Sequence, residues 1–166
     1  MHKLNPTIAL ALFVAAIPSL WAVVAPFIGV TVGAATLIVG GFFVASGNDP
    51  KNKWRLLFGM WLGIPWGMMA VTFPGLTGWP KLTLYVTLFV LGGLAVLISS
   101  MPGIRNWVDT AAWLTGWAIS IVILSLNGGP EKFGTMPLQI AGAMLAGIFI
   151  VGVLGRVLVD ALSKQN

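Results

Sequence analysis

Residues 59–69 read GMWLGIPWGMM and place three glycines, two tryptophans and one proline in a single apolar run. Gly59, Gly63 and Gly67 are spaced by four, so on a helix they form one ridge of small residues. Lipid gives helices no hydrophobic reason to associate, and close backbone approach over small residues is a main source of helix pairing in membranes. The stretch therefore predicts a membrane helix that packs through these three glycines.

The composition of the whole chain supports a membrane environment. Of 166 residues, 58% are hydrophobic and 8% are charged, whereas about 25% of residues are charged in ordinary soluble domains. A 17.5 kDa chain with a mean hydropathy of +0.97 is too small to bury that much apolar surface within itself. The chain is predicted to be an all-α polytopic protein whose main partner is the lipid bilayer.

Turn residues and charges divide the chain into six apolar blocks, each near the ~20 residues that a membrane-spanning helix needs. They cover residues 6–24, 27–46, 54–73, 82–100, 107–126 and 137–158. This pattern predicts a bundle of six transmembrane helices with short loops, forming a single integral membrane domain over residues 1–166. The first block resembles a signal peptide and is interpreted as a retained helix. The alternative has five crossings, with the first two blocks forming one re-entrant hairpin, because the connection APF at 25–27 is tight.

The distribution of Lys and Arg predicts the orientation in the membrane. Six crossings would place both chain ends on one side, together with the loops at 47–53 and 102–106. That side carries seven cationic residues, and the opposite side carries Lys81 and Lys132. Because cationic loops stay in the cytoplasm, both termini are predicted to be cytoplasmic, in the inner (plasma) membrane. The seven residues are Lys3, Lys51, Lys53, Arg55, Arg105, Arg156 and Lys164.

Polar and aromatic residues inside the blocks are the candidates for function. Trp66 lies twelve residues after Trp54, which places it ~18 Å into the membrane if Trp54 lies at the interface. In the fifth block, one helical sector collects polar and aromatic side chains along its length. The candidate lumen-lining residues are Trp66, Asp109, Trp113, Trp117, Ser120, Asn127 and Gln139. The alternative is a buried packing seam, in which Ser120 bonds to its own helix backbone.

The tryptophans of the third and fifth blocks follow similar spacings. Trp54, Trp61 and Trp66 correspond to Trp107, Trp113 and Trp117. A shorter likeness relates AIPSLW at 16–21 to GIPWG at 63–67. These likenesses favour up to three helical-hairpin repeats, which would be parallel because each repeat has two crossings.

The ionisable residues exclude several classes of function. Asp109 lies one turn from Arg105, and Asp160 one turn from Arg156, so each pair is predicted to cap a helix near the cytoplasm. No block carries Lys, Arg, Glu or His at mid-depth, which argues against a proton-coupled carrier. The chain has no cysteine and one histidine, and the spread of its cations does not predict nucleic-acid binding. We expect no catalytic residue, no metal site, no cofactor and no enzymatic activity.

Three stretches carry a family resemblance. They are PSLWAVVAPFIGV at 18–30, GGFFVASGNDPKNKWRLLFGMWLGIPWG at 40–67 and SSMPG at 99–103. Over residues 6 to 158 the chain resembles the bacterial inner-membrane family called domain of unknown function 1097. The resemblance implies a small multi-pass protein and no established activity. Relatives can carry Cys after the paired aromatics, whereas FFVASGNDP has none, which puts a thiol-dependent role in doubt.

Two classes of function follow. The first is a passive channel or facilitator for a small neutral solute, expected to be a homo-oligomer. The alternative is a non-transporting membrane assembly partner, chaperone or sensor that docks through glycine-rich helix faces.

Overall fold

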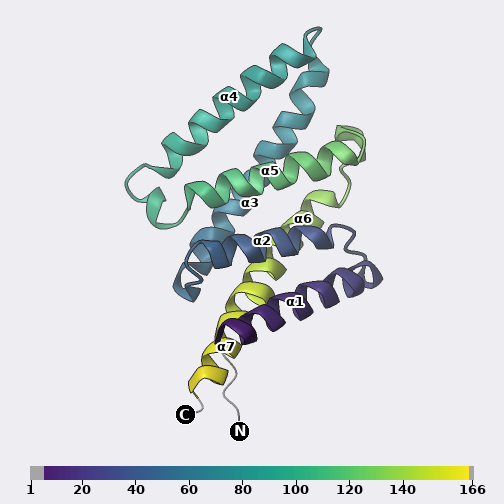
Figure 1. Cartoon of the computed structure of the whole chain (residues 1–166). Coiled ribbons are helices and arrows are strands. Elements are labelled where there is room, and N and C mark those ends of the chain that lie inside the picture. Colours follow the sequence, from purple (N-terminus) through teal and green to yellow (C-terminus); the bar gives the residue numbers. More distant parts are fainter. Residues whose placement is uncertain (1–5, 165–166) are drawn as a thin grey trace. The chain divides into compact units, whose positions relative to one another are not determined.

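The computed structural model describes residues 6–164, and this part of the chain is helical without strands, so the predicted all-α fold is confirmed. His2 and Lys3 lie outside the described residues. A π-helical segment, η6 (Gly147–Leu154), joins the sixth helix to the seventh. The α-helices (Figure 1) are α1 (Pro6–Val24), α2 (Gly33–Ala45), α3 (Lys53–Thr72), α4 (Pro80–Ser99), α5 (Thr110–Leu126), α6 (Met136–Ala146) and α7 (Gly155–Lys164).

The second helix is shorter than its apolar block. The block begins at residue 27, but α2 begins at Gly33, because Ala25–Ile28 forms a separate 3-10 turn. Pro26 lies in the first positions of this turn, where its missing N–H costs nothing. Gly29 ends the turn with a φ of 78°, a left-handed conformation that glycine adopts without strain.

Helix length limits how many crossings the structure supports. Within residues 6–164, three helices are long and apolar enough to cross a membrane: Pro50–Leu76, Pro80–Ser99 and Met136–Val157. Three other apolar helical stretches are shorter: Ala15–Ile28, Gly33–Ala45 and Thr110–Leu126. The 13 residues of α2 extend ~20 Å, whereas the hydrocarbon core is ~30 Å thick. The membrane character of the helices is thus supported, while the count of six crossings, like the five-crossing alternative, stays a prediction.

The chain divides into two compact units. Unit 1 contains Met1–Lys53 and Gly142–Asn166, and unit 2 contains Trp54–Ala141. That the two units form one membrane domain therefore stays a prediction.

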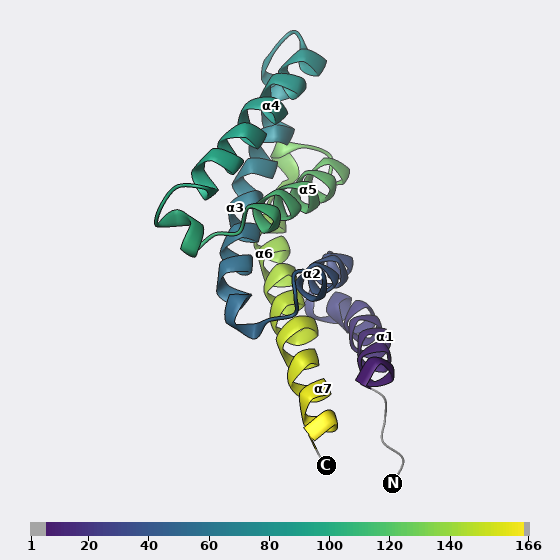
Figure 2. The same cartoon turned by 60° about the vertical axis from the view of Figure 1, so that its left-hand side comes forward.

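Unit 1 is built around the contact of α2 with η6. Thr36 is fully buried, and its Oγ1 donates a hydrogen bond of 3.1 Å to the carbonyl of Ala143. Gly147 and Gly152 lie against α2, where a Cβ would collide with Val39 and with the Phe43 ring. The start of α1 lies beside α7 in both views (Figures 1 and 2).

Unit 2 contains α3, α4 and α5. Helices α3 and α4 form a hairpin, α5 crosses α3, and α4 packs against α5 (Figure 2). The core of the unit includes Ala95 of α4, Val108 in the loop before α5, and Trp113 of α5. Leu62 and Trp66 of α3 pack against them. Aromatic and small side chains therefore meet where the three helices approach one another.

The predicted hairpin repeats are not confirmed. The third repeat would pair α5 with α6, but the division between the two units falls inside α6, after Ala141. Beyond that point the C-terminal helix packs on α2, because Gly147 and Gly152 permit that close approach. The tryptophan spacing shared by α3 and α5 therefore stays a likeness in sequence, and the repeats stay a prediction.

Candidate functional site

The glycines of α3 face α5. Gly59, Gly63 and Gly67 are buried, and a Cβ added to any of them would collide with α5. At Gly63 it would overlap the backbone where Gly116 joins Trp117, and at Gly67 it would meet the Cβ of Ser120. Gly116 in turn lies against the backbone of α3 at Met60. Two helix backbones are thus in direct contact, as small residues permit in membranes.

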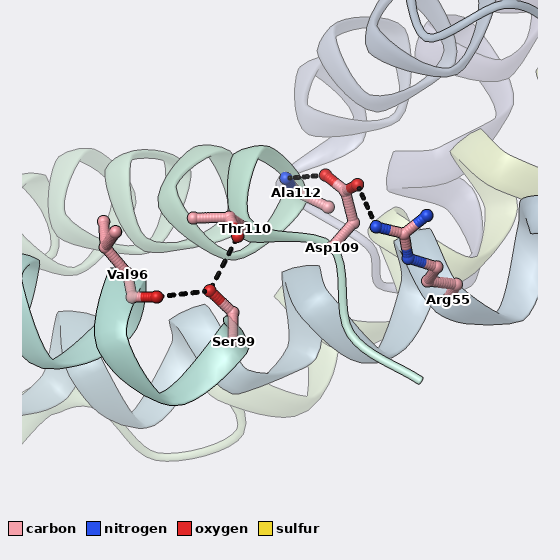
Figure 3. A network of polar contacts seen from close by, with 6 residues as sticks. All are labelled: Arg55, Val96, Ser99, Asp109, Thr110 and Ala112. Carbon is pink, nitrogen blue, oxygen red and sulfur yellow. Dashed lines mark hydrogen bonds and ion pairs between the residues drawn. The ribbon is translucent and has the colours of Figure 1, made fainter. Parts of the chain in front are cut away.

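A polar network fixes the start of α5 (Figure 3). The carboxylate of Asp109 accepts a hydrogen bond of 3.0 Å from the N–H of Ala112, so Asp109 is the N-cap and α5 begins at Thr110 rather than at residue 107. The same carboxylate lies 3.2 Å from Nη2 of Arg55 on α3. On the other side, the hydroxyls of Thr110 and Ser99 share a hydrogen bond of 2.6 Å, which ties α5 to α4.

This network corrects one prediction from the sequence. The partner of Asp109 is Arg55, from another helix, and not Arg105 one turn away. The cause is the glycine crossing, which brings the start of α3 to the start of α5, where the N–H of Asp109 also donates to the carbonyl of Arg55. The other predicted pair forms on α7, where Nε of Arg156 lies 3.0 Å from the carboxylate of Asp160.

Trp66 connects α3 to both of its neighbours. Its indole Nε1 donates a hydrogen bond of 2.9 Å to the carbonyl of Leu91 on α4. Its ring packs edge to face on Trp113 of α5, with 5.0 Å between centroids and 65° between planes. The side chain is half-buried, and both its N–H group and its ring have partners within unit 2.

Trp113 and Trp117 are buried one turn apart on α5. Trp113 is 2% exposed and Trp117 is 8% exposed. The edge of the Trp117 ring lies 3.5 Å from the position that a Cβ would take at Gly92 on α4. For both indoles, no residue of the described chain accepts a hydrogen bond from Nε1. Buried tryptophans usually find an acceptor, so two such donors side by side are unusual.

The remaining candidates are bonded locally. Ser120 is fully buried, and its hydroxyl donates to the carbonyl of Gly116 at 2.7 Å, as the packing interpretation predicts. Asn127 ends α5 and donates to the carbonyl of Lys132 at 3.3 Å. Gln139 is half-buried, and its amide donates to the hydroxyl of Thr135, which directly precedes α6. The structure thus brings together Trp66, Trp113 and Trp117, while the polar candidates lie at the ends of helices or bond to their own helix.

No sequence pattern marked the residues of α4 that contribute to this site. Leu91 contributes a backbone carbonyl, Gly92 contributes space, and Ala95 is fully buried near Trp113. None has a polar or aromatic side chain that would mark it as a candidate. A second omission is Trp61, whose Nε1 donates to the carbonyl of Ala141 at 3.1 Å. Because every residue has a backbone carbonyl, the type of side chain does not indicate which residue will be the acceptor.

The surroundings of the three indoles are uncharged. In the described part of unit 2, charged side chains occur only at helix ends and in loops: Arg55, Lys81, Arg105, Asp109, Glu131 and Lys132. The middle of the unit therefore offers indole N–H donors and apolar surface.

One known protein family matches most of the chain. The model of the family described as "Protein of unknown function (DUF1097)" matches residues 11–159. The chain belongs to this family. No curated protein and no solved structure matches the chain. The DUF1097 match includes every candidate residue discussed above, from Arg55 to Gln139, so the indole cluster lies within the region that defines membership.

Proposed function

We propose that this DUF1097 protein is a facilitator for small neutral solutes in the inner membrane, with a path through unit 2 between α3, α4 and α5. The supporting observation is the pair of buried indole donors, Trp113 and Trp117, that no described residue satisfies. A buried unsatisfied donor costs about 1–3 kcal/mol. A solute that accepts hydrogen bonds would offset this cost as it passes.

The absence of charge in the middle of unit 2 determines what would pass. An ion entering this region would lose its hydration, and neither indole faces nor apolar side chains replace it. A neutral solute loses far less. We therefore expect permeation of small neutral molecules and exclusion of ions.

Packing of the glycines argues against the alternative function. A partner that docks through glycine-rich faces needs those faces to be accessible. The ridge of Gly59, Gly63 and Gly67 is covered by α5, and Gly147 and Gly152 are covered by α2. Among the described α-helices, open space remains at Gly41, Gly93 and Gly142, which do not form a ridge.

The membrane arrangement belongs to the same proposal. The cationic loops support cytoplasmic termini. The outer face of α4 is exposed and apolar, as shown by Tyr85 and Phe89. Such a surface suits lipid or a second copy of the chain in a homo-oligomer.

A swelling assay tests the proposal. Proteoliposomes with the full chain are shrunk in an osmotic gradient of acetamide or glycerol, and the recovery of their volume is compared with that of protein-free vesicles. We expect faster recovery for both solutes, with potassium conductance equal to that of the lipid control. Equal recovery with and without protein would leave the facilitator proposal without support, and potassium conductance above the control would contradict its selectivity.

A further inference from the structure

The four tryptophans in the interior of unit 2 differ in how their N–H groups are used. Trp61 donates to Ala141 and Trp66 donates to Leu91, each to a backbone carbonyl of another helix. Trp113 and Trp117 have no acceptor among the residues described. All four are of the same chemical type in one small unit, so the difference comes from position and not from the nature of the indole.

The two unsatisfied donors lie on the same helix. Trp113 and Trp117 are four residues apart on α5, which places them on one face and ~6 Å apart along the axis. Indole N–H donates and does not accept. A ligand between them must therefore supply acceptor atoms, and in uncharged surroundings a neutral acceptor is favoured over an anion.

We propose that Trp113 and Trp117 form a two-donor binding site for small neutral molecules with a carbonyl oxygen, such as amides and ketones. This inference rests on the proposed function, because it names the solutes that the path would favour. The N–H of one indole donates to the carbonyl oxygen as the solute enters, and the N–H of the other, one turn away, then becomes the donor. No covalent step is involved.

Access to this site is from the α4 side, near Trp117. Trp117 is the more exposed of the two indoles, and its ring edge lies over Gly92, where no Cβ restricts it. Trp113 lies deeper, against Trp66 and Ala95. A solute that enters from this side would therefore meet Trp117 before Trp113.

The experiment uses the indole N–H signals of the full chain in lipid nanodiscs, observed by ¹H–¹⁵N NMR and assigned by Trp→Phe variants. Acetone, acetamide and isobutene are added in separate titrations, because isobutene has the shape of acetone without its oxygen. We expect acetone and acetamide to move the signals of Trp113 and Trp117 downfield, and isobutene to cause no such shift. The signals of Trp61 and Trp66 are the internal control, since their N–H groups are already bonded.

Two outcomes would overturn the inference. One is that the signals of Trp113 and Trp117 do not move with either oxygen compound. The other is that all four signals move alike, which indicates a solvent effect. Failure of the proposed function looks different: the two signals would shift while the swelling assay gives the same recovery as protein-free vesicles. Conversely, fast swelling without any shift would preserve the facilitator and exclude this binding site.

Discussion

Gly63 of α3 lies directly against the backbone of Gly116 on α5, so the two helices meet without a side chain between them. This contact brings Arg55 to Asp109 at one end and Trp66 to Trp113 in the middle. The geometry of the candidate site thus depends on a contact between two residues that have no side chain.

The first prediction concerns this crossing. Gly63→Ala places a Cβ on the backbone at Trp117, and overpacking of this kind typically costs about 1–3 kcal/mol. Gly63→Leu is expected to cost more. The measurement is thermal unfolding of the purified protein in detergent, with oligomer size followed by chromatography.

Gly93→Ala is the matched control, because it also lies inside a helix but has open space around it. It should melt at the same temperature as the wild type or higher, since alanine favours helix by roughly 0.5–1 kcal/mol over glycine. Equal melting of the Gly63 and Gly93 variants would contradict the close crossing.

The second prediction separates the two roles of Asp109. Asp109→Asn keeps a capping side chain and loses the ion pair with Arg55, whereas Asp109→Ala loses both. The pair is partly exposed, at 40% and 24%, so it contributes at most about 1 kcal/mol, and loss of the cap costs about another 1 kcal/mol. We expect unfolding temperatures in the order wild type, Asn, Ala. Arg105→Gln should leave stability unchanged, and a loss there equal to that of Arg55→Gln would support the local pair instead.

The third prediction compares two indoles. Trp66→Phe removes the hydrogen bond to Leu91, worth about 0.5–1.5 kcal/mol, in addition to ring volume. Trp117→Phe removes ring volume together with a buried N–H that no described residue satisfies, and loss of that N–H offsets part of the cost. Trp66→Phe should therefore lower the free energy of unfolding more, by about 1 kcal/mol. Equal losses in denaturant titrations would show that the bond to Leu91 contributes nothing.

The fourth prediction concerns topology. Seven of nine Lys and Arg fall on the side predicted to hold both termini, so both are expected in the cytoplasm. A C-terminal fusion to a reporter that is active only in the periplasm should give no signal, while the same reporter fused at the 127–134 loop should be active. An active C-terminal fusion would favour an odd number of crossings.

Much of the helical architecture could be predicted from the sequence. Runs of apolar residues separated by Gly, Pro and charged residues locate helices well, because a lipid-exposed backbone within the hydrocarbon core has to be helical or paired in a closed sheet. The third block, 54–73, differs from α3 by one residue at each end. The spacing of Gly59, Gly63 and Gly67 indicated a contact face, and the structure places all three against α5.

The partners of these residues could not be predicted, because they depend on which helices meet. The ridge of α3 has no feature that selects α5 over another helix, so the pair of Arg55 with Asp109 was missed in favour of Arg105, which is nearer in sequence. The acceptor for Trp66 is a backbone carbonyl, which every residue possesses. Helix length was also uncertain, since the turn at Ala25–Ile28 is apolar and shortens α2 without a polar signal.

The central claim is that small neutral solutes pass Trp117, and Trp117→Ala tests it most directly. The ring is buried, so the variant should be less stable, by up to about 3–5 kcal/mol, on any account of its role. Permeability is therefore the deciding quantity. If Trp117 narrows a path, proteoliposomes with folded Trp117→Ala protein should swell faster in acetamide than those with wild type, while potassium conductance stays at the lipid control. Lower melting with unchanged swelling would contradict the claim and leave Trp117 with a packing role alone.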